Sequence, residues 1–270
     1  ISSSTADAQG SLTEAGFDSN GTAIGTTPSV SGTLTSSDVD NNATASWSIE
    51  GTSSGTYGSI AIDQNTGTWT YTLNNTDPDT QALDLGDSVS ETFTARVTDD
   101  NNAYAEQDIT VYITGSNDAP VVSSSPQDAA GSVAEAGNLD DGNNDPGSPS
   151  VSGSLAATDI DTDAALTWSI DNSVDGLTTG TYGSISISAD GNWSYSLDNS
   201  LDATQRLEEG ESQTDSFTAR VTDQHGASAT QTISVSVTGT NDSPVISSST
   251  ADAQGSLTEA GFDSNGTAIG

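Results

Sequence analysis

The sequence predicts an all-β protein made of tandem Greek-key β-sandwiches that are joined end to end. Short runs of alternating apolar and polar residues, typical of strands with one buried face, recur along the 270 residues. Two such runs, 109–113 and 233–237, end in the similar motifs Gly-Ser-Asn-Asp-Ala-Pro (115–120) and Gly-Thr-Asn-Asp-Ser-Pro (239–244). Gly and Pro end a strand, whereas Asn and Asp offer oxygen ligands. The motifs therefore predict stiff joints between domains.

The joints divide the chain into a first β-sandwich at 1–118, a second at 119–242, and the first strand of a third repeat at 243–270. Residues 246–270 repeat residues 1–25 without a difference, so we expect a parent chain with a repeating unit of 245 residues. The sequence begins at Ile1 without Met or a signal peptide, which favours an excised segment of a secreted, extracellular protein.

The net charge of the chain limits the classes of partner that it can bind. There are 39 acidic residues against three Arg and no Lys, and the formal net charge is −36. Such a surface repels nucleic acid and anionic membranes, and its self-repulsion favours binding of divalent cations, with Ca²⁺ as the first candidate. The absence of Cys excludes disulfides and thiolate metal sites, and no apolar run is long enough to insert into a membrane.

The two copies place their strands and acidic residues in the same order. A first strand ends near Glu14 or Glu135, and a polar segment follows; in the second copy its residues 140–145 are more consistent with a solvated loop than with an ion site. The next strand runs into Asp-x-Asp, whose carboxylates at i and i+2 can converge on one cation. An acidic connection and a strand that stops at an Asp complete the pattern, which gives the pairs Asp38 and Asp40 with Asp159 and Asp161, Asp84 and Asp87 with Glu208 and Glu211, and Asp99 with Asp223.

The strands between these acids carry aromatic residues and Arg. Each Trp (47, 69, 168 and 193) lies on a strand parity that predicts core packing rather than a sugar-stacking platform. The pattern around 55–73 and 183–197 predicts a hairpin in each copy. Arg96 and Arg220 lie on the outward parity of their strands, where a cross-strand ion pair is expected.

Greek-key topology predicts where the acids gather. The second-to-third and sixth-to-seventh loops lie at the N-terminal end of a seven-strand sandwich, which groups Asp38, Asp40 and Asp99, whereas Glu14 and the Asp84 loop lie at the other end. Each junction thus collects carboxylates from two domains. They repel one another unless Ca²⁺ bridges them, and extracellular sites of this kind have a Kd of about 10⁻⁴ to 10⁻³ M.

The ordered motifs resemble a known repeat. Val-Ser-Gly-x-Leu-x-x-x-Asp-x-Asp, Gly-Thr-Tyr-Gly-Ser-Ile, Trp-x-Tyr-x-Leu, Phe-Thr-Ala-Arg-Val-Thr-Asp and Thr-Gly-x-Asn-Asp-x-Pro are similar to the VCBS repeat, over essentially the whole chain. This cadherin-like, immunoglobulin-like module occurs in tandem in giant bacterial surface adhesins and RTX-type proteins. The resemblance implies an extracellular extender with calcium at its domain junctions.

The resemblance to cadherin junctions also implies a ligand set. Glu14, Asp84, Asp87, Asn117 and Asp118 would meet Asp159, Asp161 and Asp223 at the first junction, and the matching positions elsewhere are Asp38, Asp40, Asp99, Glu135, Glu208, Glu211, Asn241 and Asp242. The linker departs from the cadherin pattern because Gly115 replaces its first Asp and Ala119 its last Asn. The number of ions per junction is therefore left open.

Two functions compete at this point. The first is a calcium-stiffened extender of a long adhesin or surface filament, whose partners are the neighbouring repeats of its own chain, with lateral self-association into fibres left open. The second is a carbohydrate-binding sandwich, which requires exposed aromatic residues on one face. An enzyme is not expected, because the sole His225 replaces Asn101 of the first copy, Cys is absent, and no Ser has a base beside it.

Overall fold

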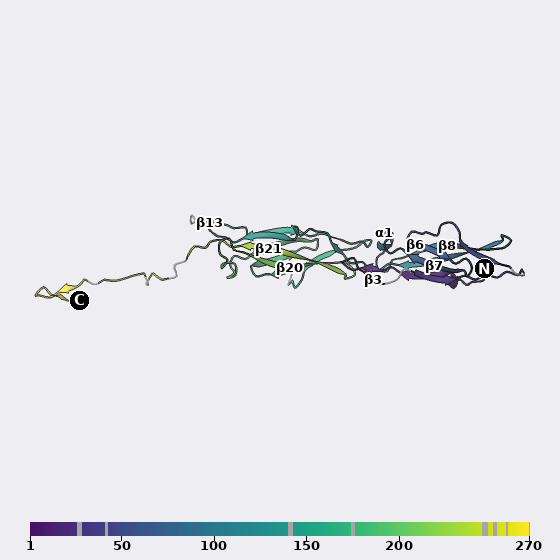
Figure 1. The fold of residues 1–270 in the computed structure, drawn as a ribbon. Coiled ribbons are helices and arrows are strands. Elements are labelled where there is room, and N and C mark those ends of the chain that lie inside the picture. Colours follow the sequence, from purple (N-terminus) through teal and green to yellow (C-terminus); the bar gives the residue numbers. More distant parts are fainter. Residues whose placement is uncertain are drawn as a thin grey trace.

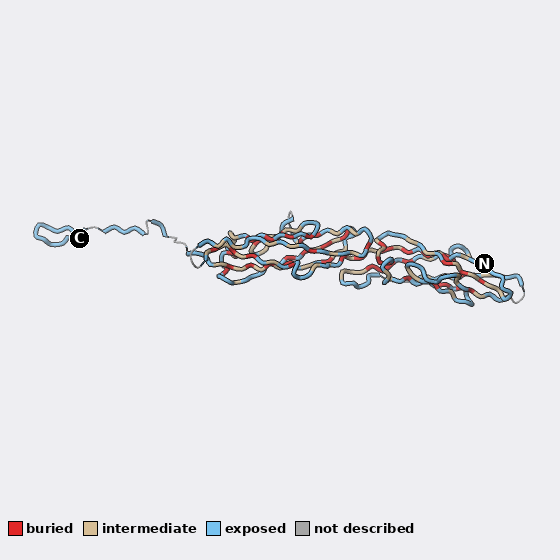
Figure 2. The backbone as a smooth tube through the Cα atoms, turned by 90° about the horizontal axis from the view of Figure 1, so that it is seen from above, coloured by how far each residue is buried: buried red, intermediate tan, exposed pale blue. Residues whose placement is uncertain are grey.

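Two β-sandwiches lie end to end in the computed structural model (Figure 1). The structure describes residues 1–25, 29–40, 43–139, 143–173, 176–244, 248–250, 253–257 and 259–269. Buried residues run through the interior of both sandwiches, whereas the C-terminal tail leads away from the second one and is exposed (Figure 2). The predicted all-β, tandem architecture is confirmed.

The first sandwich packs a four-stranded sheet against a three-stranded one. The strand order is β1-β9-β8-β5 in the four-stranded sheet and β4-β7-β6 in the three-stranded sheet. The strands are β1 (Gln9–Thr13), β4 (Ser29–Thr33), β5 (Ala45–Ile49), β6 (Gly58–Ile62), β7 (Thr68–Leu73), β8 (Ser88–Asp99) and β9 (Tyr104–Thr114). β1 pairs with β9 in parallel, and the other pairs are antiparallel. Smaller elements are η1 (Thr5–Ala8), α1 (Pro78–Gln81) and the ladder of β2 (Gly16–Phe17) with β3 (Ala23–Ile24).

The second sandwich repeats this arrangement and adds one edge strand. Its sheets have the orders β11-β21-β20-β16 and β14-β19-β18-β17. The strands are β11 (Ala130–Ala134), β14 (Ser150–Ser154), β16 (Thr167–Ile170), β17 (Leu177–Thr179), β18 (Gly183–Ile187), β19 (Asn192–Leu197), β20 (Ser212–Thr222) and β21 (Ser228–Thr238). β11 again pairs in parallel with the last strand, β21. Two short ladders join β12 (Gly137–Asn138) to β13 (Asn144–Asp145) and β10 (Val121–Val122) to β15 (Ala157–Thr158).

The Trp side chains form the centre of both cores, as predicted. Their exposed fractions are 5% for Trp47, 0% for Trp69, 6% for Trp168 and 1% for Trp193. A Cβ atom at Gly32 would lie 2.7 Å from Trp69, so glycine is required where this backbone crosses the indole. The indole nitrogen of Trp69 donates to the carbonyl of Asp7 at 2.9 Å, which satisfies the polar atom of a buried ring.

The Arg side chains also lie as predicted. Arg96 pairs with Glu50 at 3.0 Å and with Glu106 at 2.6 Å, and Arg220 pairs with Asp171 at 2.8 Å. These partners come from neighbouring strands or from the residue after a neighbouring strand. The pairs are part-exposed, so water screens them and each contributes little to stability.

A carboxylate ties the two sheets together in each sandwich, buried in the second and half-buried in the first, and the sequence alone did not indicate it. In the second sandwich Asp215 of β20 is 3% exposed and accepts hydrogen bonds from the hydroxyl of Tyr195 (2.8 Å) and the amides of Thr181 (2.8 Å) and Tyr182 (3.0 Å). Glu91 does the same in the first sandwich with Tyr71, Thr56 and Tyr57.

Asp215→Ala should destabilise the second sandwich by about 3 kcal/mol, because it leaves three donors without their acceptor. Urea unfolding measures the loss. Tyr195→Phe is the matched control, since it removes only one of the three hydrogen bonds and should cost about 1 kcal/mol. Equal losses for the two variants would show that the carboxylate does not hold the network together.

The C-terminal tail repeats the sequence of the first residues but only part of their structure. β22 (Gly261–Phe262) pairs with β23 (Ala268–Ile269) just as β2 pairs with β3. Residues 255–257, which match part of β1, lie outside any strand, because β1 obtains its hydrogen-bond partner from β9 of its own sandwich. The division of the chain at 118 and 242 stays a prediction. Of the predicted 140–145 loop, residues 140–142 lie outside the described part. No helix among the described residues is long and apolar enough to cross a membrane.

Candidate metal centre at the domain junction

The linker between the sandwiches is fixed by both of them. It leaves β9 at Thr114, and the amide of Ala119 donates to the carbonyl of Phe17 in the first sandwich at 2.9 Å. Two residues later β10 pairs with β15 of the second sandwich. The term exit denotes the end of each sandwich at which its last strand ends. The opposite end is called the entrance. The junction thus joins the exit of the first sandwich to the entrance of the second.

Acidic side chains from both sandwiches are buried at this junction. The exposed fraction is 4% for Glu14 and 1% for Asp118 on the exit side, and 6% for Asp161 and 8% for Asp223 on the entrance side. The amide of Asp118 donates to Asp161 Oδ2 at 2.8 Å, and Asn117 Nδ2 donates to Asp223 Oδ2 at 3.0 Å. Carboxylates from both sandwiches therefore lie together, and among the described residues no Arg forms an ion pair with these four.

Several oxygens in this cluster have no hydrogen-bond partner among the described residues. Buried side-chain oxygens without a partner include one each from five junction residues: Glu14 Oε2, Asn117 Oδ1, Asp118 Oδ2, Asp159 Oδ2 and Asp161 Oδ1. The other oxygen of Glu14 accepts from Gln81 Nε2 at 2.7 Å, and that of Asp118 accepts from the amide of Phe17 at 2.5 Å. A buried unpaired acceptor costs about 1 to 3 kcal/mol, and more when it is charged. Five such oxygens from the residues of one junction form a set of acceptors that a cation could satisfy.

The pKa values of these carboxyl groups also show that little positive charge lies near them. Burial, followed by the nearby carboxylate of Asp118, raises the pKa of Glu14 from its ordinary 4.5 to about 8. Burial is also the main cause that raises the pKa of Asp161 to about 7 and that of Asp118 to about 6, and it raises the pKa of Asp159. Carboxylates with such values resist ionisation near neutral pH unless a cation compensates them.

The donor set fits calcium in kind, although the arrangement is not closed. Carboxylate and amide oxygens are the ligands that Ca²⁺ takes, six to eight at a time, with geometry that tolerates adjustment. Among the described residues, no three His, Cys, Asp or Glu side chains meet as a finished metal cluster. The unpaired oxygens would therefore have to move closer together to hold an ion.

Three other predicted ligands of this junction are already engaged. Asp84 binds His225 Nε2 (3.0 Å) and Gln224 Nε2 (3.1 Å) across the junction, and these partners hold the pKa of Asp84 below its ordinary value despite partial burial. Asp87 accepts from the amide of Asp84 at 3.2 Å and is exposed. Asp223 Oδ1 accepts the amides of His225 and Ala227.

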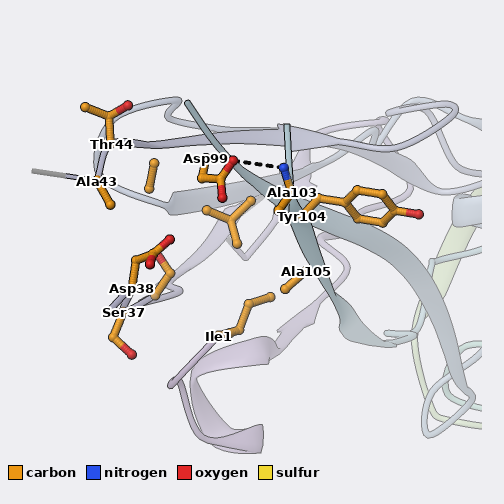
Figure 3. Close-up of a pocket in the computed structure, with 12 residues that line it drawn as sticks. Ile1, Ser37, Asp38, Ala43, Thr44, Asp99, Ala103, Tyr104 and Ala105 are labelled. Atoms are coloured by element: carbon orange, nitrogen blue, oxygen red, sulfur yellow. Dashed lines mark hydrogen bonds between the residues drawn. The ribbon is translucent and has the colours of Figure 1, made fainter. Parts of the chain in front are cut away.

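At the entrance of the first sandwich, Asp38, Asp40 and Asp99 match the entrance acids of the second sandwich, but no domain is docked against them among the described residues. Asp38 and Asp99 line a pocket of about 300 Å³ with Ile1, Ala43 and Tyr104, and the Asp99 carboxylate accepts the amide of Ala103 (Figure 3). Asp40 does not line this pocket and is exposed, as is Asp38, whereas the matching Asp161 is buried. Docking of a preceding domain, rather than the local sequence, is what buries these acids.

The exit of the second sandwich repeats the exit of the first. Glu135 is fully buried, as Glu14 is nearly, and it accepts from Gln205 Nε2 at 2.9 Å. Glu208 and Glu211 share the turn that Asp84 and Asp87 form, since the amide of Glu208 donates to Glu211 Oε2 at 3.1 Å. Asn241 and Asp242 are exposed, in contrast to the buried Asp118.

Sequence reasoning missed the polar residues that position these acids. Gln81 and Gln205 hold Glu14 and Glu135 in place, and their recurrence at one position of both copies was the available signal. His225 and Gln224 do not recur, because the first copy has Asn101 and Asp100 there. They could be found only as a difference between the copies.

The fold and the acidic junction define a tandem β-sandwich protein with a carboxylate-rich domain joint. Residues 117–239 match the model of the bacterial cadherin-like domain, which covers the second sandwich. A search of curated proteins by sequence found no match.

Cadherin structures are among the solved structures that resemble the chain. Domains EC22–24 of mouse cadherin-23 align with a TM-score of 0.43 and 14% identity over 86% of this chain and 62% of theirs. Domains EC1–3 of protocadherin gamma C5 align with 0.43 and 14% over 85% and 65%, and domains 3–6 of protocadherin gamma B2 with 0.42 and 16% over 87% and 51%. The chain thus spans less than two thirds of the length of each of these structures.

Proposed function

We propose that this chain is an extender segment of an extracellular surface protein, and that Ca²⁺ at the domain junction locks its sandwiches end to end. The observation that carries the proposal is the set of five buried, unpartnered oxygens contributed by both sandwiches. Glu14, Asn117 and Asp118 would hold the ion from the exit side, and Asp159 and Asp161 from the entrance side. The match of the second sandwich to a bacterial cadherin-like domain supports an adhesive or structural role on the cell surface.

The residues of the chain prepare the site before an ion arrives. Gln81 orients Glu14, and the amides of Phe17 and Asp118 fix one oxygen each of Asp118 and Asp161. Each of these carboxylates therefore keeps its second oxygen free. A bound Ca²⁺ supplies the positive charge that compensates them. Because the ligands come from two domains, ion binding and domain docking are thermodynamically linked.

The buried Trp side chains count against the carbohydrate-binding alternative, although Tyr104 and Tyr112 of β9 are 61% and 43% exposed. All four Trp side chains are buried in the two cores, so none forms a platform on which a sugar ring could stack. The exposed aromatic side chains of the first sandwich include Tyr104, whose ring lies 4.2 Å from the Arg96 guanidinium carbon and is thus already covered on one face.

A calcium titration of the full chain tests the proposal. Calcium at about a hundred times Kd should stabilise the docked sandwiches by about 2.7 kcal/mol per ion and raise the melting temperature, and EDTA should reverse the rise. Calorimetry should give at least one ion for the single complete junction, with a Kd of about 10⁻⁴ to 10⁻³ M. Mg²⁺ is the control, since it dehydrates reluctantly and prefers a stricter geometry. A calcium stoichiometry near zero would overturn the proposal.

A further inference from the structure

We propose that a second, ion-independent contact beside the candidate metal centre docks the exit of the first sandwich onto the entrance of the second, and that the entrance of the first sandwich cannot form this contact. We call this contact the latch; it consists of Ala82 and Asp84 on the exit side and Thr162, Gln224 and His225 on the entrance side. It shares the junction with the proposed calcium site but requires no ion.

The latch is a set of direct hydrogen bonds across the junction. Thr162 donates its hydroxyl (2.7 Å) and its amide (3.1 Å) to the carbonyl of Ala82. Gln224 Nε2 lies 3.1 Å from Asp84 Oδ2, and His225 Nε2 lies 3.0 Å from Asp84 Oδ1. The side chains of Asp84 and His225 are 21% and 27% exposed, so water competes only in part for these bonds.

The entrance loop presents the two donor side chains in a fixed geometry. Asp223 Oδ1 accepts the amides of His225 (2.8 Å) and Ala227 (3.0 Å), which closes the loop around its carboxylate. Gln224 Oε1 accepts the amide of Ala165 at 2.8 Å, so the carboxamide is oriented with its nitrogen toward Asp84. The latch is therefore built into the second sandwich before the two domains meet.

The first sandwich has the same loop without the donors. Asp99 Oδ1 accepts the amides of Asn101 and Ala103, both at 2.8 Å, and Asn102 takes the positive φ that Gly226 takes in the second copy. The loop backbones thus correspond, but Asp100 and Asn101 stand where Gln224 and His225 stand. An exit carboxylate docked at this entrance would face Asp100, which repels it.

The exits, in contrast, are alike in charge. Glu208 occupies the position of Asp84, and both residues lie in turns of the same pattern. Either exit thus presents a carboxylate, but only the entrance of the second sandwich offers donors for it. The two entrances therefore differ in kind: the entrance of the second sandwich accepts an exit carboxylate through the latch, whereas that of the first sandwich carries a like charge at the same place.

The test transfers the loop side chains of the first sandwich to the second in the full chain. Gln224→Asp with His225→Asn should raise the undocked fraction in EDTA about tenfold, which corresponds to about 1.4 kcal/mol. The absence of Cys allows spin labels at Thr70→Cys and Ser194→Cys, two exposed positions on matching strands, and the inter-label distance distribution measures docking. The reciprocal change, Asp100→Gln with Asn101→His, is the matched control and should leave the distribution unchanged.

The outcomes separate the latch from the calcium proposal. A distribution in EDTA that is narrow for the wild type and broad for the Gln224/His225 variant supports the latch, and narrowing of the variant by calcium supports both proposals. Broadening of the variant that calcium does not reverse, with no calcium effect on the wild type, supports the latch and overturns the calcium site. Identical distributions for wild type and variant in EDTA overturn the latch.

Discussion

The double variant Glu14→Gln with Asp161→Asn should lose its calcium response while its two sandwiches remain folded. Both changes keep the shape of the side chain and the hydrogen bonds that position it, since Gln81 can still donate to residue 14 and the amide of Asp118 to residue 161. They remove two of the buried negative charges that only a cation compensates. A calcium-dependent rise in melting temperature of about 10 °C per filled site should disappear.

The same variant should be more stable than the wild type in EDTA. Neutral amides at these positions avoid the cost of burying two carboxylates and, to a lesser extent, their repulsion by neighbouring acids such as Asp118. Differential scanning calorimetry with and without calcium measures both effects. Glu135→Gln is the matched control, because the corresponding exit of the second sandwich has no docked domain among the described residues, and it should leave the calcium response of the junction intact. A double variant that still gains the full stabilisation would exclude Glu14 and Asp161 as ligands.

The metal-free chain should lose stability as the pH rises from about 4 to 8. The folded-state pKa values of Glu14 (about 8) and Asp161 (about 7) lie above their ordinary values of 4.5 and 3.8, so the folded chain binds more protons than the unfolded chain in this window. The free energy of unfolding therefore falls with pH there. The exposed carboxylates of Asp18 and Asp63, whose pKa values are lowered by hydrogen bonds in their turns, titrate below this window.

Calcium should flatten this pH dependence and release protons as it binds. The ion requires the ionised carboxylates, so the protons held by Glu14 and Asp161 must leave when the site fills. Titrations at pH 6.5 in buffers of different ionisation enthalpy count these protons, and thermal unfolding in EDTA between pH 5 and 8.5 measures the slope. The Glu14/Asp161 variant should release no protons from these two positions and should show a smaller pH dependence, since only the raised pKa values of carboxyls such as Asp118 and Asp159 remain. A melting temperature in EDTA that does not vary over this range would contradict the assigned pKa shifts.

The local alternation of apolar and polar residues was sufficient to predict most of the fold. Alternating runs gave the strands of both sandwiches and placed the four Trp side chains in the cores, because a period of two fixes which face is buried. The edge strand β17 was not predicted, since Leu177–Thr179 is short and its Leu is 48% exposed. The carboxylates of Glu91 and Asp215 were also missed, because an acid within a strand normally faces water and gives no sign that a Tyr hydroxyl lies opposite.

The candidate site was predictable in outline but not in the roles of its members. The repeated Glu, Asp-x-Asp and Asn-Asp motifs indicated which residues gather at the junction, and Glu14, Asp118 and Asp161 are indeed buried together. The sequence could not show that Asp84 is bound by His225 and Gln224, since these residues lie 140 or more positions away. Distinguishing an unpaired oxygen from an engaged one requires the hydrogen bonds of the folded junction.

The parallel pairing of the first and last strands determines how each sandwich carries a mechanical load. Tension along the chain enters the first sandwich at β1 and leaves it at β9, and these strands are direct neighbours that point the same way from Gln9–Thr110 to Thr13–Thr114. Pulling on the two ends slides one strand along the other, so the hydrogen bonds between them share the force and must break together. β11 and β21 repeat this geometry in the second sandwich. Each of the two sandwiches thus resists stretching along the chain, and its rupture force reflects the rate of forced unfolding rather than its equilibrium stability.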